Sequence, residues 1–391
     1  MNVCFETFGC RLNRAEALED EARCIAIGHN IVTEHAKADF FVVRGCSVTS
    51  RAQRDCEKLI EHLREKYPTK RLHVTGCIKN ARPLVIKQIG ELTSVPMRTA
   101  RAYLKAQNGC SGECTFCIVP QFRGKSAAED FRSVLDKAKR FIDVGYTEIV
   151  LTGCNLSLYA SGGKRLPDLV SALAELDPGC RIRLGSLEPF LAAEETIDAM
   201  ADHANVCRFL HMPVQSGSDP ILAKMKRPYT ADKAEALMSK ARQLMPSVAL
   251  GADMIAGFPG ETERDQLASE ALLTRQKVVN IHSFPFSRRP GTPAATFPGQ
   301  LAHETIVKRA KKLAKLGETN RRSFARRFEK QTVEVVIENG GNAASGWTGE
   351  YLWFEEEPSV GGEPRRPLKR REKVNFLVKE GRNGLLTGTR I

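Results

Sequence analysis

The first part of the chain, residues 1–92, alternates short apolar runs with amphipathic segments. Three runs have the length and apolar content of strands, and they end in Gly9-Cys10, Gly45-Cys46 and Gly76-Cys77. Between them, residues 14–27 and 50–66 carry apolar side chains at helical spacing. This alternation predicts a small open α/β domain with parallel strands, whose carboxyl ends bring the three cysteines to one edge of the sheet.

The middle of the chain alternates strand-like and helix-like segments six times after a turn-rich linker at Thr93–Arg98. The helix over residues 134–142 illustrates the pattern, since its apolar side chains share one face and it stops at Gly145. Repeated strand–helix units predict a parallel barrel or open sheet, with active loops at the carboxyl ends of the strands. The predicted strands are Tyr103–Gln107, Glu148–Leu151, Arg181–Ser186, Phe209–Val214, Ala249–Ile255 and Val278–Phe284.

The last segment, residues 331–391, changes to short apolar runs separated by Gly, Pro and Asn turns. We predict strands at residues 333–337, 347–354, 374–378 and 384–388, which together form a small β-barrel. Both tryptophans of the chain, Trp347 and Trp353, lie in this module, near a basic loop. Aromatic and cationic side chains together suit RNA, although strand alternation places at least one of these aromatics in the core.

The charge of the chain is strongly positive. It has 59 Lys and Arg against 46 Asp and Glu, a formal net charge of +13, which favours a polyanionic partner. The excess gathers at residues 308–330 and 365–371, although either stretch alone would also fit a solvated face. No apolar run reaches the ~18 residues of a membrane span, and no segment is like a signal peptide. We therefore expect a cytoplasmic protein without a membrane partner, whose 12 cysteines are reduced and suited to bind metal.

Three cysteines of one short loop, Cys110, Cys114 and Cys117, have the spacing C-x3-C-x2-C. Disulfide pairing would leave one thiol over, whereas three thiolates suit a [4Fe-4S] cluster that keeps one iron open for a small molecule. A zinc loop is the alternative. The Gly-Cys cysteines, Cys10, Cys46 and Cys77, form a second such tripod unless each is simply a buried core thiol. We predict structural roles for the remaining cysteines, with Cys154 the least clear because it also follows a strand: Cys4, Cys24, Cys56, Cys154, Cys180 and Cys207.

The loop with three cysteines, with Phe116 directly before the last of them, resembles the radical S-adenosylmethionine (SAM) enzymes. That resemblance implies a partial (β/α)6 barrel and places the amino acid end of SAM on the open iron. Glycines and polar side chains at the strand ends then suit a SAM pocket, although each of these loops alone would also fit a tight turn. The expected SAM contacts are Phe116, Gly153, Glu188, Gln215, Ser216, Gly257 and Phe258.

The order of two tripods and a terminal barrel resembles the methylthiotransferases across essentially the whole chain. Agreement extends to motifs such as Gly9-Cys10-Arg11-Leu12-Asn13, Ser186-Leu187-Glu188-Pro189 and Gln215-Ser216-Gly217-Ser218. The resemblance implies an N-terminal domain at 1–92 that holds an auxiliary cluster, a radical SAM domain at 96–328, and an RNA-binding barrel similar to the TRAM domain at 331–391. Residues 287–295 are most like the branch that acts on N6-threonylcarbamoyladenosine beside the tRNA anticodon.

The resemblance also implies how two [4Fe-4S] clusters and SAM are used. In that family the radical SAM cluster cleaves SAM reductively, and the resulting 5′-deoxyadenosyl radical abstracts hydrogen from carbon 2 of the adenine. The auxiliary cluster presents sulfur, and a second SAM supplies the methyl group. Implied partners are tRNA, a sulfur donor and a reductase or a flavodoxin- or ferredoxin-type electron donor, with the chain acting as a monomer.

Three departures from the family pattern bear on the substrate. Arg44-Gly45-Cys46 stands where Asn-Thr-Cys is usual, Asn108-Gly109-Cys110 replaces Asp-Gly-Cys, and an arginine usual after Arg123-Gly124 is absent around Ala127. The sister substrates, isopentenyladenosine in tRNA and an aspartate of a ribosomal protein, therefore stay as alternatives. A cluster-bearing RNA-binding or sulfur-carrier protein is the non-enzymatic alternative, and it would bind tRNA without cleaving SAM.

Overall fold

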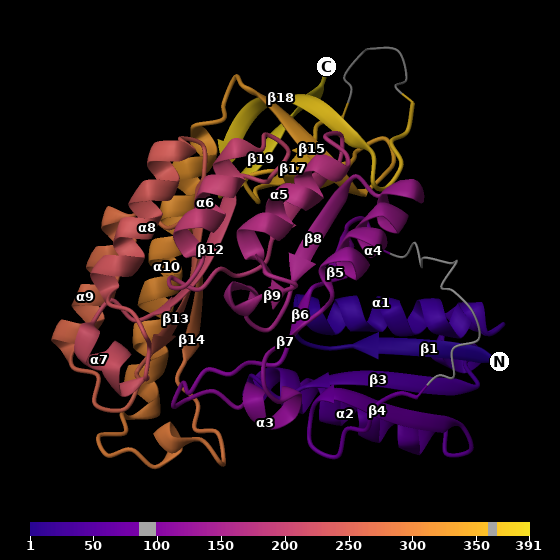
Figure 1. Ribbon diagram of the computed structural model, residues 1–391, viewed down its shortest axis with the longest axis horizontal. Helices are drawn as coiled ribbons and strands as arrows, with labels where there is room; N and C mark the ends of the chain where they lie inside the picture. Colours follow the sequence, from indigo (N-terminus) through magenta and orange to yellow (C-terminus); the bar gives the residue numbers. More distant parts are fainter. Residues whose placement is uncertain (86–98, 359–365) are drawn as a thin grey trace.

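The computed structural model describes residues 1–85, 99–358 and 366–391. It contains an N-terminal sheet, a central α/β unit and a C-terminal barrel (Figure 1). The predicted linker at Thr93–Arg98, the expected boundary between residues 92 and 96, and Arg365 of the basic loop lie outside the described residues.

The N-terminal unit is a parallel four-stranded sheet in the order β2-β1-β3-β4. Apolar side chains alternate along β1 and β3, so that one face packs against α2 through Phe41 and Leu63, while the opposite face holds Val3 and Val42. The elements are β1 Asn2–Thr7, α1 Arg11–Ala26, β2 Asn30–Val32, the short 3-10 helix His35–Lys37, β3 Phe40–Cys46, α2 Ser50–Lys66 and β4 Arg71–Cys77.

The central unit is a partial barrel built from two three-stranded parallel sheets, β11-β8-β5 and β12-β13-β14. Only isolated bridges, Ile182 with Val206 and Ser186 with His211, join β11 to β12 among the described residues. The six predicted strands are therefore confirmed as the strands of a partial barrel. Its two sheets are joined by little strand pairing. Its strands are β5 Ala102–Lys105, β8 Glu148–Thr152, β11 Arg181–Leu184, β12 Phe209–Gln215, β13 Ala249–Ala256 and β14 Asn280–Pro285.

Helices cover the outer face of this barrel (Figure 1). The helix α4 begins where Asp130 accepts a hydrogen bond from the Ser133 amide and ends before Gly145, whose φ of 91° suits glycine. The helices are α3 Val119–Arg123, α4 Phe131–Asp143, α5 Leu166–Leu176, α6 Ala193–Asp202, α7 Asp219–Lys224, α8 Ala231–Leu244, α9 Glu263–Arg275 and α10 His303–Arg326. Short elements complete the unit: β6 Gln107–Asn108, β7 Ala127–Ala128, β9 Ala160–Ser161, β10 Lys164–Arg165 and the 3-10 helices Leu156–Leu158 and Pro293–Ala295.

The first helix of the chain packs on the inner face of the barrel. Ala15 and Leu18 of α1 form a buried cluster with Tyr103 of β5 and Val150 of β8. Neighbouring strand residues such as Leu104 point to the opposite face and pack in the outer core. The N-terminal unit thus covers the open side of the partial barrel and carries Cys10, at the start of α1, toward its strand ends.

The C-terminal unit is a closed barrel in the order β15-β16-β17-β19-β18, which confirms the predicted β-barrel. One predicted strand, 347–354, is wrong: it is two strands joined by a turn in which Tyr351 has a φ of 62°. That turn lets the Tyr351 ring stack on Trp347, with centroids 4.4 Å apart. The strands are β15 Thr332–Asn339, β16 Ser345–Thr348, β17 Trp353–Glu356, β18 Lys373–Arg382 and β19 Leu385–Arg390.

The C-terminal barrel sits over the amino ends of the central strands (Figure 1). Arg181 and Arg183 at the start of β11 donate hydrogen bonds to the carbonyls of Trp347 and Thr348, both at 2.8 Å. Both guanidinium groups also bind the fully buried carboxylate of Glu148. Among the described helices, none has the length and apolar character that crossing a membrane requires.

Candidate functional site

The first tripod is formed by the carboxyl ends of the N-terminal strands. Cys46 and Cys77 are paired in register at the ends of β3 and β4, and Cys10 immediately precedes α1. Burial raises the pKa of the Cys77 thiol, and charge on the nearby Cys10 and Cys46 contributes to the rise. The positive charge of Arg123 lowers this pKa in part. The three thiols predicted from the Gly-Cys pattern are therefore brought together.

Glycine before these cysteines is required by space as well as by backbone angle. Gly9 has a φ of 92°, and a Cβ atom placed on it would lie 2.6 Å from the Cβ of Cys46. A Cβ on Gly76, which has a φ of 89°, would lie 2.7 Å from the carbonyl oxygen of Gly45. Larger residues would therefore push the tripod apart.

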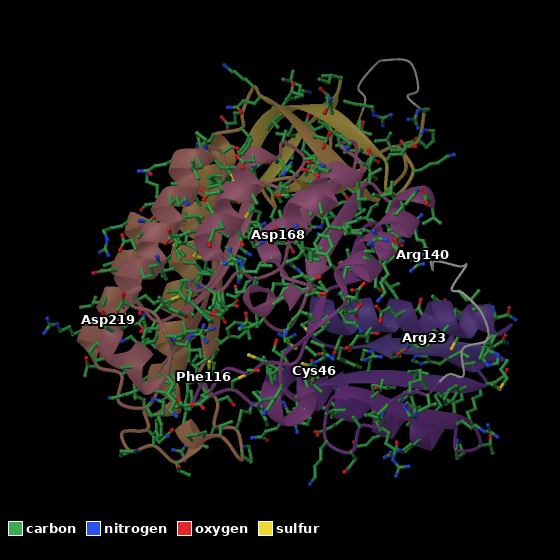
Figure 2. All side chains as sticks on the ribbon, viewed as in Figure 1. Arg23, Cys46, Phe116, Arg140, Asp168 and Asp219 are labelled. Atoms are coloured by element: carbon green, nitrogen blue, oxygen red, sulfur yellow. The ribbon has the colours of Figure 1, made fainter. Side chains whose placement is uncertain are left out.

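The second tripod is the loop of Cys110, Cys114 and Cys117. The amide of Cys110 donates to the carbonyl of Gly124 at 3.0 Å, and the amide of Cys117 donates to the carbonyl of Cys114 at 3.1 Å. Burial raises the pKa of Cys117 to about 12, and the neighbouring Cys114 and Cys110 contribute to the rise. In Figure 2, Cys46 of the first tripod lies at the end of the N-terminal sheet that is nearer the central unit, and Phe116 of the second tripod's loop lies to its left, at the lower end of the central unit.

The spacing of the thiols bears on which metal group fits. Among the described residues, the groups whose ligand atoms lie within 4.8 Å of one another, as a single ion would require, are Cys4 with Glu6 and His35, and His211 with Asp253 and His282. Neither tripod is that compact. Wider sets of three thiols suit a cluster better than a zinc ion, because a [4Fe-4S] cluster separates its ligands across a cube.

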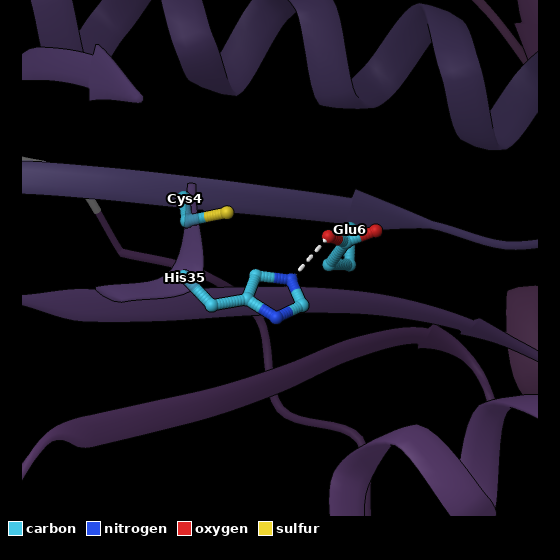
Figure 3. A group of neighbouring side chains, drawn as sticks. All are labelled: Cys4, Glu6 and His35. Carbon is cyan, nitrogen blue, oxygen red and sulfur yellow. Dashed lines mark hydrogen bonds and ion pairs between the residues drawn. The ribbon is translucent and has the colours of Figure 1, made fainter. Parts of the chain in front are cut away.

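The group of Cys4, Glu6 and His35 lies on one face of the N-terminal sheet, beside β1 (Figure 3). His35 Nε2 is 2.7 Å from Glu6 Oε1, and the ring packs edge-on against Phe41. Cys4 itself is 1% exposed and belongs to the core of this sheet. These contacts are those of a packed strand face, in keeping with the structural role predicted for Cys4.

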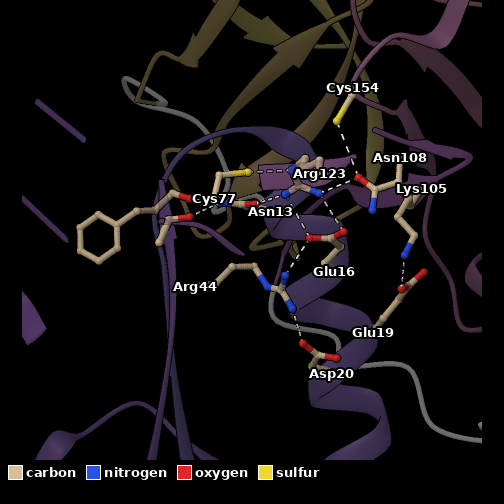
Figure 4. Close-up of polar contacts among 12 residues, drawn as sticks. Asn13, Glu16, Glu19, Asp20, Arg44, Cys77, Lys105, Asn108, Arg123 and Cys154 are labelled. Atoms are coloured by element: carbon tan, nitrogen blue, oxygen red, sulfur yellow. Dashed lines mark hydrogen bonds and ion pairs between the residues drawn. The ribbon is translucent and has the colours of Figure 1, made fainter. Parts of the chain in front are cut away.

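Arg123 makes hydrogen bonds to several side chains beside the first tripod (Figure 4). Its Nε donates to the Cys77 sulfur at 2.7 Å, and Nη1 donates to Glu16 at 3.0 Å and to Asn108 at 2.8 Å. Asn13 accepts from Nη2 at 2.5 Å. Since Asn108 precedes Cys110 by two positions, this one side chain links both tripods.

Arg227 has the corresponding place at the second tripod. Its Nη1 donates to the Cys114 sulfur at 2.9 Å, and Nη2 donates to Glu188. The hydroxyl of Tyr229 accepts a hydrogen bond from Arg227 Nε at 2.7 Å. Sequence reasoning missed Arg227 because no local pattern points across the 113 positions that separate it from Cys114.

The residues predicted to contact SAM have different neighbours in the structure. Glu188 is paired with Arg227; burial raises the pKa of this carboxyl to about 7, although Arg227 lowers it. Phe258 is fully buried in a cluster that Phe116 packs against. Gly153 lies against Gln107, so close that a Cβ would be 2.9 Å from its Oε1.

The remaining predicted contacts also lie at strand ends. Gln215 adopts a φ of 67° at the end of β12, and Ser216 accepts a hydrogen bond from the Ser218 amide at 3.2 Å. The amide of Gly257, at a φ of 75°, donates to Glu261 at 3.0 Å. Their role toward SAM stays a prediction.

A polar group that sequence reasoning missed spans the second sheet of the barrel. Asp253 Oδ1 lies 2.9 Å from His211 Nε2 and 3.1 Å from His282 Nδ1. Although burial raises the pKa of Asp253, the two imidazoles hold it well below its usual range. Because these residues come from three adjacent strands, only the sheet register brings them together.

A cavity of about 560 Å³ opens around the end of β4, with lining residues on both sides of Cys77. Its basic lining consists of Arg44, Lys79, Arg82 and Arg123, against one carboxylate, Glu16. Arg44 is buried and paired with Glu16 at 2.7 Å. Lys79 and Arg82 are exposed, and among the described residues neither has an ion pair.

Two of the three departures from the family pattern, Arg44 and the region of Ala127, lie in different places. Arg44 lines the cavity. Ala127 instead pairs with Asn108 in a short antiparallel ladder and is outside the cavity lining.

The basic stretch of α10 divides into structural and exposed residues. Arg309 is buried and binds Glu261 at 2.6 Å, and Arg321 donates to the carbonyl of Gly384 at 3.1 Å. Exposed cations remain along the helix: Lys308, Lys311, Lys315, Arg322 and Arg326. Trp347 faces the central unit, with the guanidinium of Arg101 5.5 Å from its ring centroid, so it is used in packing between units.

Comparison with known proteins adds a family context. Residues 104–271 match the Radical SAM superfamily, and residues 2–95 match the family described as Uncharacterized protein family UPF0004. The chain is 29% identical to threonylcarbamoyladenosine tRNA methylthiotransferase MtaB of Bacillus subtilis (strain 168), over 90% of this chain and 89% of that protein. It is 30% identical to tRNA-2-methylthio-N(6)-dimethylallyladenosine synthase of Mycobacterium ulcerans (strain Agy99), over 85% and 73%.

A solved structure shares the fold. The radical S-adenosylmethionine methyltransferase TsrM from Kitasatospora setae superposes with a TM-score of 0.56, covering 75% of this chain and 77% of that chain at 13% identity. At that identity, the likeness concerns the fold alone.

Proposed function

Since this chain belongs to the tRNA methylthiotransferases of the radical SAM superfamily, we propose that its substrate is N6-threonylcarbamoyladenosine beside the tRNA anticodon. The chain is a transferase that methylthiolates tRNA, with SAM and two [4Fe-4S] clusters as its cofactors. The proposed product is the 2-methylthio derivative of that nucleoside.

The basic cavity around Cys77 is the observation that carries this choice of substrate. A threonylcarbamoyl group ends in a carboxylate and a hydroxyl, whereas an isopentenyl group is a hydrocarbon. Lys79 and Arg82 offer charges to an anionic substituent, and an apolar tail there would leave them desolvated without a partner. The charge of the lining therefore favours the threonylcarbamoyl form.

The chain's own residues then have distinct tasks. We assign the auxiliary cluster to Cys10, Cys46 and Cys77, and the radical SAM cluster to Cys110, Cys114 and Cys117. When bound, the clusters and SAM supply the radical that activates carbon 2, the sulfur and the methyl group. Arg123 and Arg227 orient one cysteine of each tripod, and α1 excludes water by filling the open side of the barrel.

The exposed cations of α10 suit the tRNA backbone. Lys308, Lys311 and Lys315 recur on the exposed side of the helix, where they can neutralise phosphates. A low-potential electron donor and a sulfur donor complete the proposed set of partners.

Mass spectrometry of tRNA nucleosides from cells that lack the gene, with and without the gene restored, tests the proposal. We expect 2-methylthio-N6-threonylcarbamoyladenosine only when the gene is present. Restoration of the isopentenyl counterpart instead would overturn the substrate but keep the reaction, and that outcome is the one suggested by the relative from Mycobacterium ulcerans. If neither nucleoside responds, tRNA methylthiolation by this chain is contradicted.

A further inference from the structure

Three titratable side chains to which the proposed function gives no task meet on the inner face of the barrel. Met254 of β13 packs in the outer core, so Asp253, one position before it, points to the opposite, inner face. His211 of β12 and His282 of β14, on the two neighbouring strands, reach the same carboxylate oxygen, Oδ1, at 2.9 Å and 3.1 Å. These three residues are called the His-Asp-His group below.

The spacing of the ligand atoms in this group is that of a metal site. One ligand atom from each of the three residues lies within 4.8 Å of the other two. Zinc binds histidine nitrogen and carboxylate oxygen at about 2.0–2.2 Å, so two ligands at right angles around one ion lie about 3 Å apart. The observed distances from Asp253 Oδ1, 2.9 Å and 3.1 Å, therefore need little change to admit an ion.

The charge of Asp253 gives a second, independent indication that a cation binds here. The buried carboxylate of Glu261, for comparison, is paired with Arg309. The Asp253 side chain is only 22% exposed, and its ion pairs among the described residues are with His211 and His282 alone. Imidazole is uncharged unless it is protonated, so these partners do not match the permanent charge of an arginine. A divalent ion would supply the positive charge that a largely buried carboxylate requires.

The surroundings of the two histidines suit ligands of a metal. A Cβ atom on Gly251, which is paired with His211 in the sheet, would lie 2.4 Å from His211 Nδ1, so glycine makes room for this ring. His282 Nε2 lies 3.3 Å from the side-chain amide of Asn280, and histidine ligands usually make such a hydrogen bond through the second ring nitrogen. The side chain of His282 is 48% exposed, so an ion has access to the group from that side.

We propose that His211, Asp253 and His282 bind one divalent transition-metal ion, separate from the two clusters. Two imidazoles and one carboxylate, without a thiolate, suit Zn²⁺, Fe²⁺ or Mn²⁺. Each imidazole binds through the nitrogen that faces Asp253 and keeps its proton on the other ring nitrogen, and no oxidation state changes. Three protein ligands leave coordination positions open toward the barrel interior, where water or an oxygen atom of a substrate binds.

The test uses the full chain reconstituted with both clusters, and Mn²⁺ is the probe. Oxidised [4Fe-4S] clusters give no electron paramagnetic resonance (EPR) signal, so the signal of free Mn²⁺ can be followed as the chain is added. We expect the natural chain to bind a single Mn²⁺, and Zn²⁺ to displace it because such ligands bind zinc more tightly. His282→Asn should weaken Mn²⁺ binding about tenfold or more, and His282→Asp, which returns a ligand atom, should recover part of the loss.

His35→Asn is the matched control, because His35 belongs to the other compact group, with Cys4 and Glu6, and it should leave the affinity unchanged. Pulsed EPR of Mn²⁺ bound to the natural chain should show coupling to imidazole nitrogen, which tests the ligands without any substitution. Equal affinities of the natural chain and His282→Asn would overturn the proposal, since the ion would then bind to thiols or surface groups. Failure of the natural chain to bind Mn²⁺, or bound Mn²⁺ without nitrogen coupling, would overturn it as well. An unchanged iron content in each variant shows that its fold is intact.

Discussion

Arg123 donates a hydrogen bond from Nε to the sulfur of Cys77 at 2.7 Å. Arg227 repeats this relationship at Cys114, at 2.9 Å. Each guanidinium is buried and held by a carboxylate, Glu16 in one case and Glu188 in the other. A positive charge and a hydrogen bond on a ligand sulfur stabilise the reduced, more negative state of an iron–sulfur cluster.

Removing the Arg123 charge should lower the reduction potential of the auxiliary cluster. We expect Arg123→Gln to do so in the chain that carries only this cluster, and Arg123→Lys to restore part of the loss. An EPR-monitored redox titration measures the potential. Arg23→Gln, in the last turn of α1 and away from the tripod (Figure 2), should leave it unchanged. An unchanged potential in Arg123→Gln would show that this hydrogen bond does not persist in the loaded protein.

The same logic applies to Arg227 and the radical SAM cluster. Arg227→Gln should lower the potential of that cluster in a chain with Cys10→Ala, Cys46→Ala and Cys77→Ala. A harder reduction should also slow the formation of 5′-deoxyadenosine from SAM under a limiting reductant. If Arg227→Gln leaves the reduction potential unchanged but slows SAM cleavage, Arg227 instead positions SAM through Glu188.

Iron analysis tests the two tripods directly. Reconstituted chain should bind about eight irons, and replacement of Cys10, Cys46 and Cys77 by alanine should reduce this to about four. Cys24→Ala, which removes a buried thiol of α1 in the same N-terminal unit, should leave the iron content intact. If the triple replacement does not change the iron content, the N-terminal cysteines do not hold a cluster.

The cavity cations should decide affinity for the substrate rather than for tRNA in general. We expect Lys79→Ala with Arg82→Ala to reduce kcat/KM for threonylcarbamoylated tRNA by about tenfold or more, because charge-assisted hydrogen bonds to a carboxylate are lost. Binding of total tRNA should change little. Lys58→Ala, an exposed cation of α2 outside the cavity, is the control. Equal losses of tRNA binding and turnover would instead indicate contact with the RNA backbone.

Glu148 holds the junction between the central unit and the C-terminal barrel. Its carboxylate binds Arg183 at 2.7 Å and Arg181 at 2.5 Å, and all three side chains are buried. Glu148→Gln should lower the free energy of unfolding by about 3–5 kcal/mol, because it removes the buried carboxylate that both buried guanidinium groups bind. Denaturant unfolding measures this, and Glu235→Gln, which breaks the exposed ion pair with Arg275, should have a much smaller effect. If both substitutions lower the free energy of unfolding by the same amount, the ion pairs of Glu148 do not hold the junction together.

The pH dependence of that junction follows from the same ion pair. Although burial raises the pKa of Glu148, Arg183 and Arg181 hold it well below its ordinary value of 4.5. Stability from a carboxyl with a depressed pKa is fully present above its ordinary pKa and is lost as the pH falls toward the folded-state pKa. The difference in unfolding free energy between the natural chain and Glu148→Gln should therefore be constant near neutral pH and shrink below about pH 4.5.

The sequence by itself determined the six cluster cysteines as candidates and the order of the three units. The loop cysteines were readable because one short loop sets their spacing, and the Gly-Cys cysteines because the carboxyl ends of parallel strands share one edge. Strand and helix alternation is likewise a local pattern. It misled at residues 347–354, where the positive φ of Tyr351 converts one apparent strand into two.

Only the tertiary structure decided which side chains surround those cysteines. Arg123 and Cys77 are 46 positions apart, and Arg227 and Cys114 are 113 apart, so no periodicity connects them. The meeting of His211, Asp253 and His282 depends on the register of three strands, which the apolar alternation along each strand does not specify. Contacts between units arise from packing, and because packing joins residues distant in the chain, the sequence pattern carries no local trace of them.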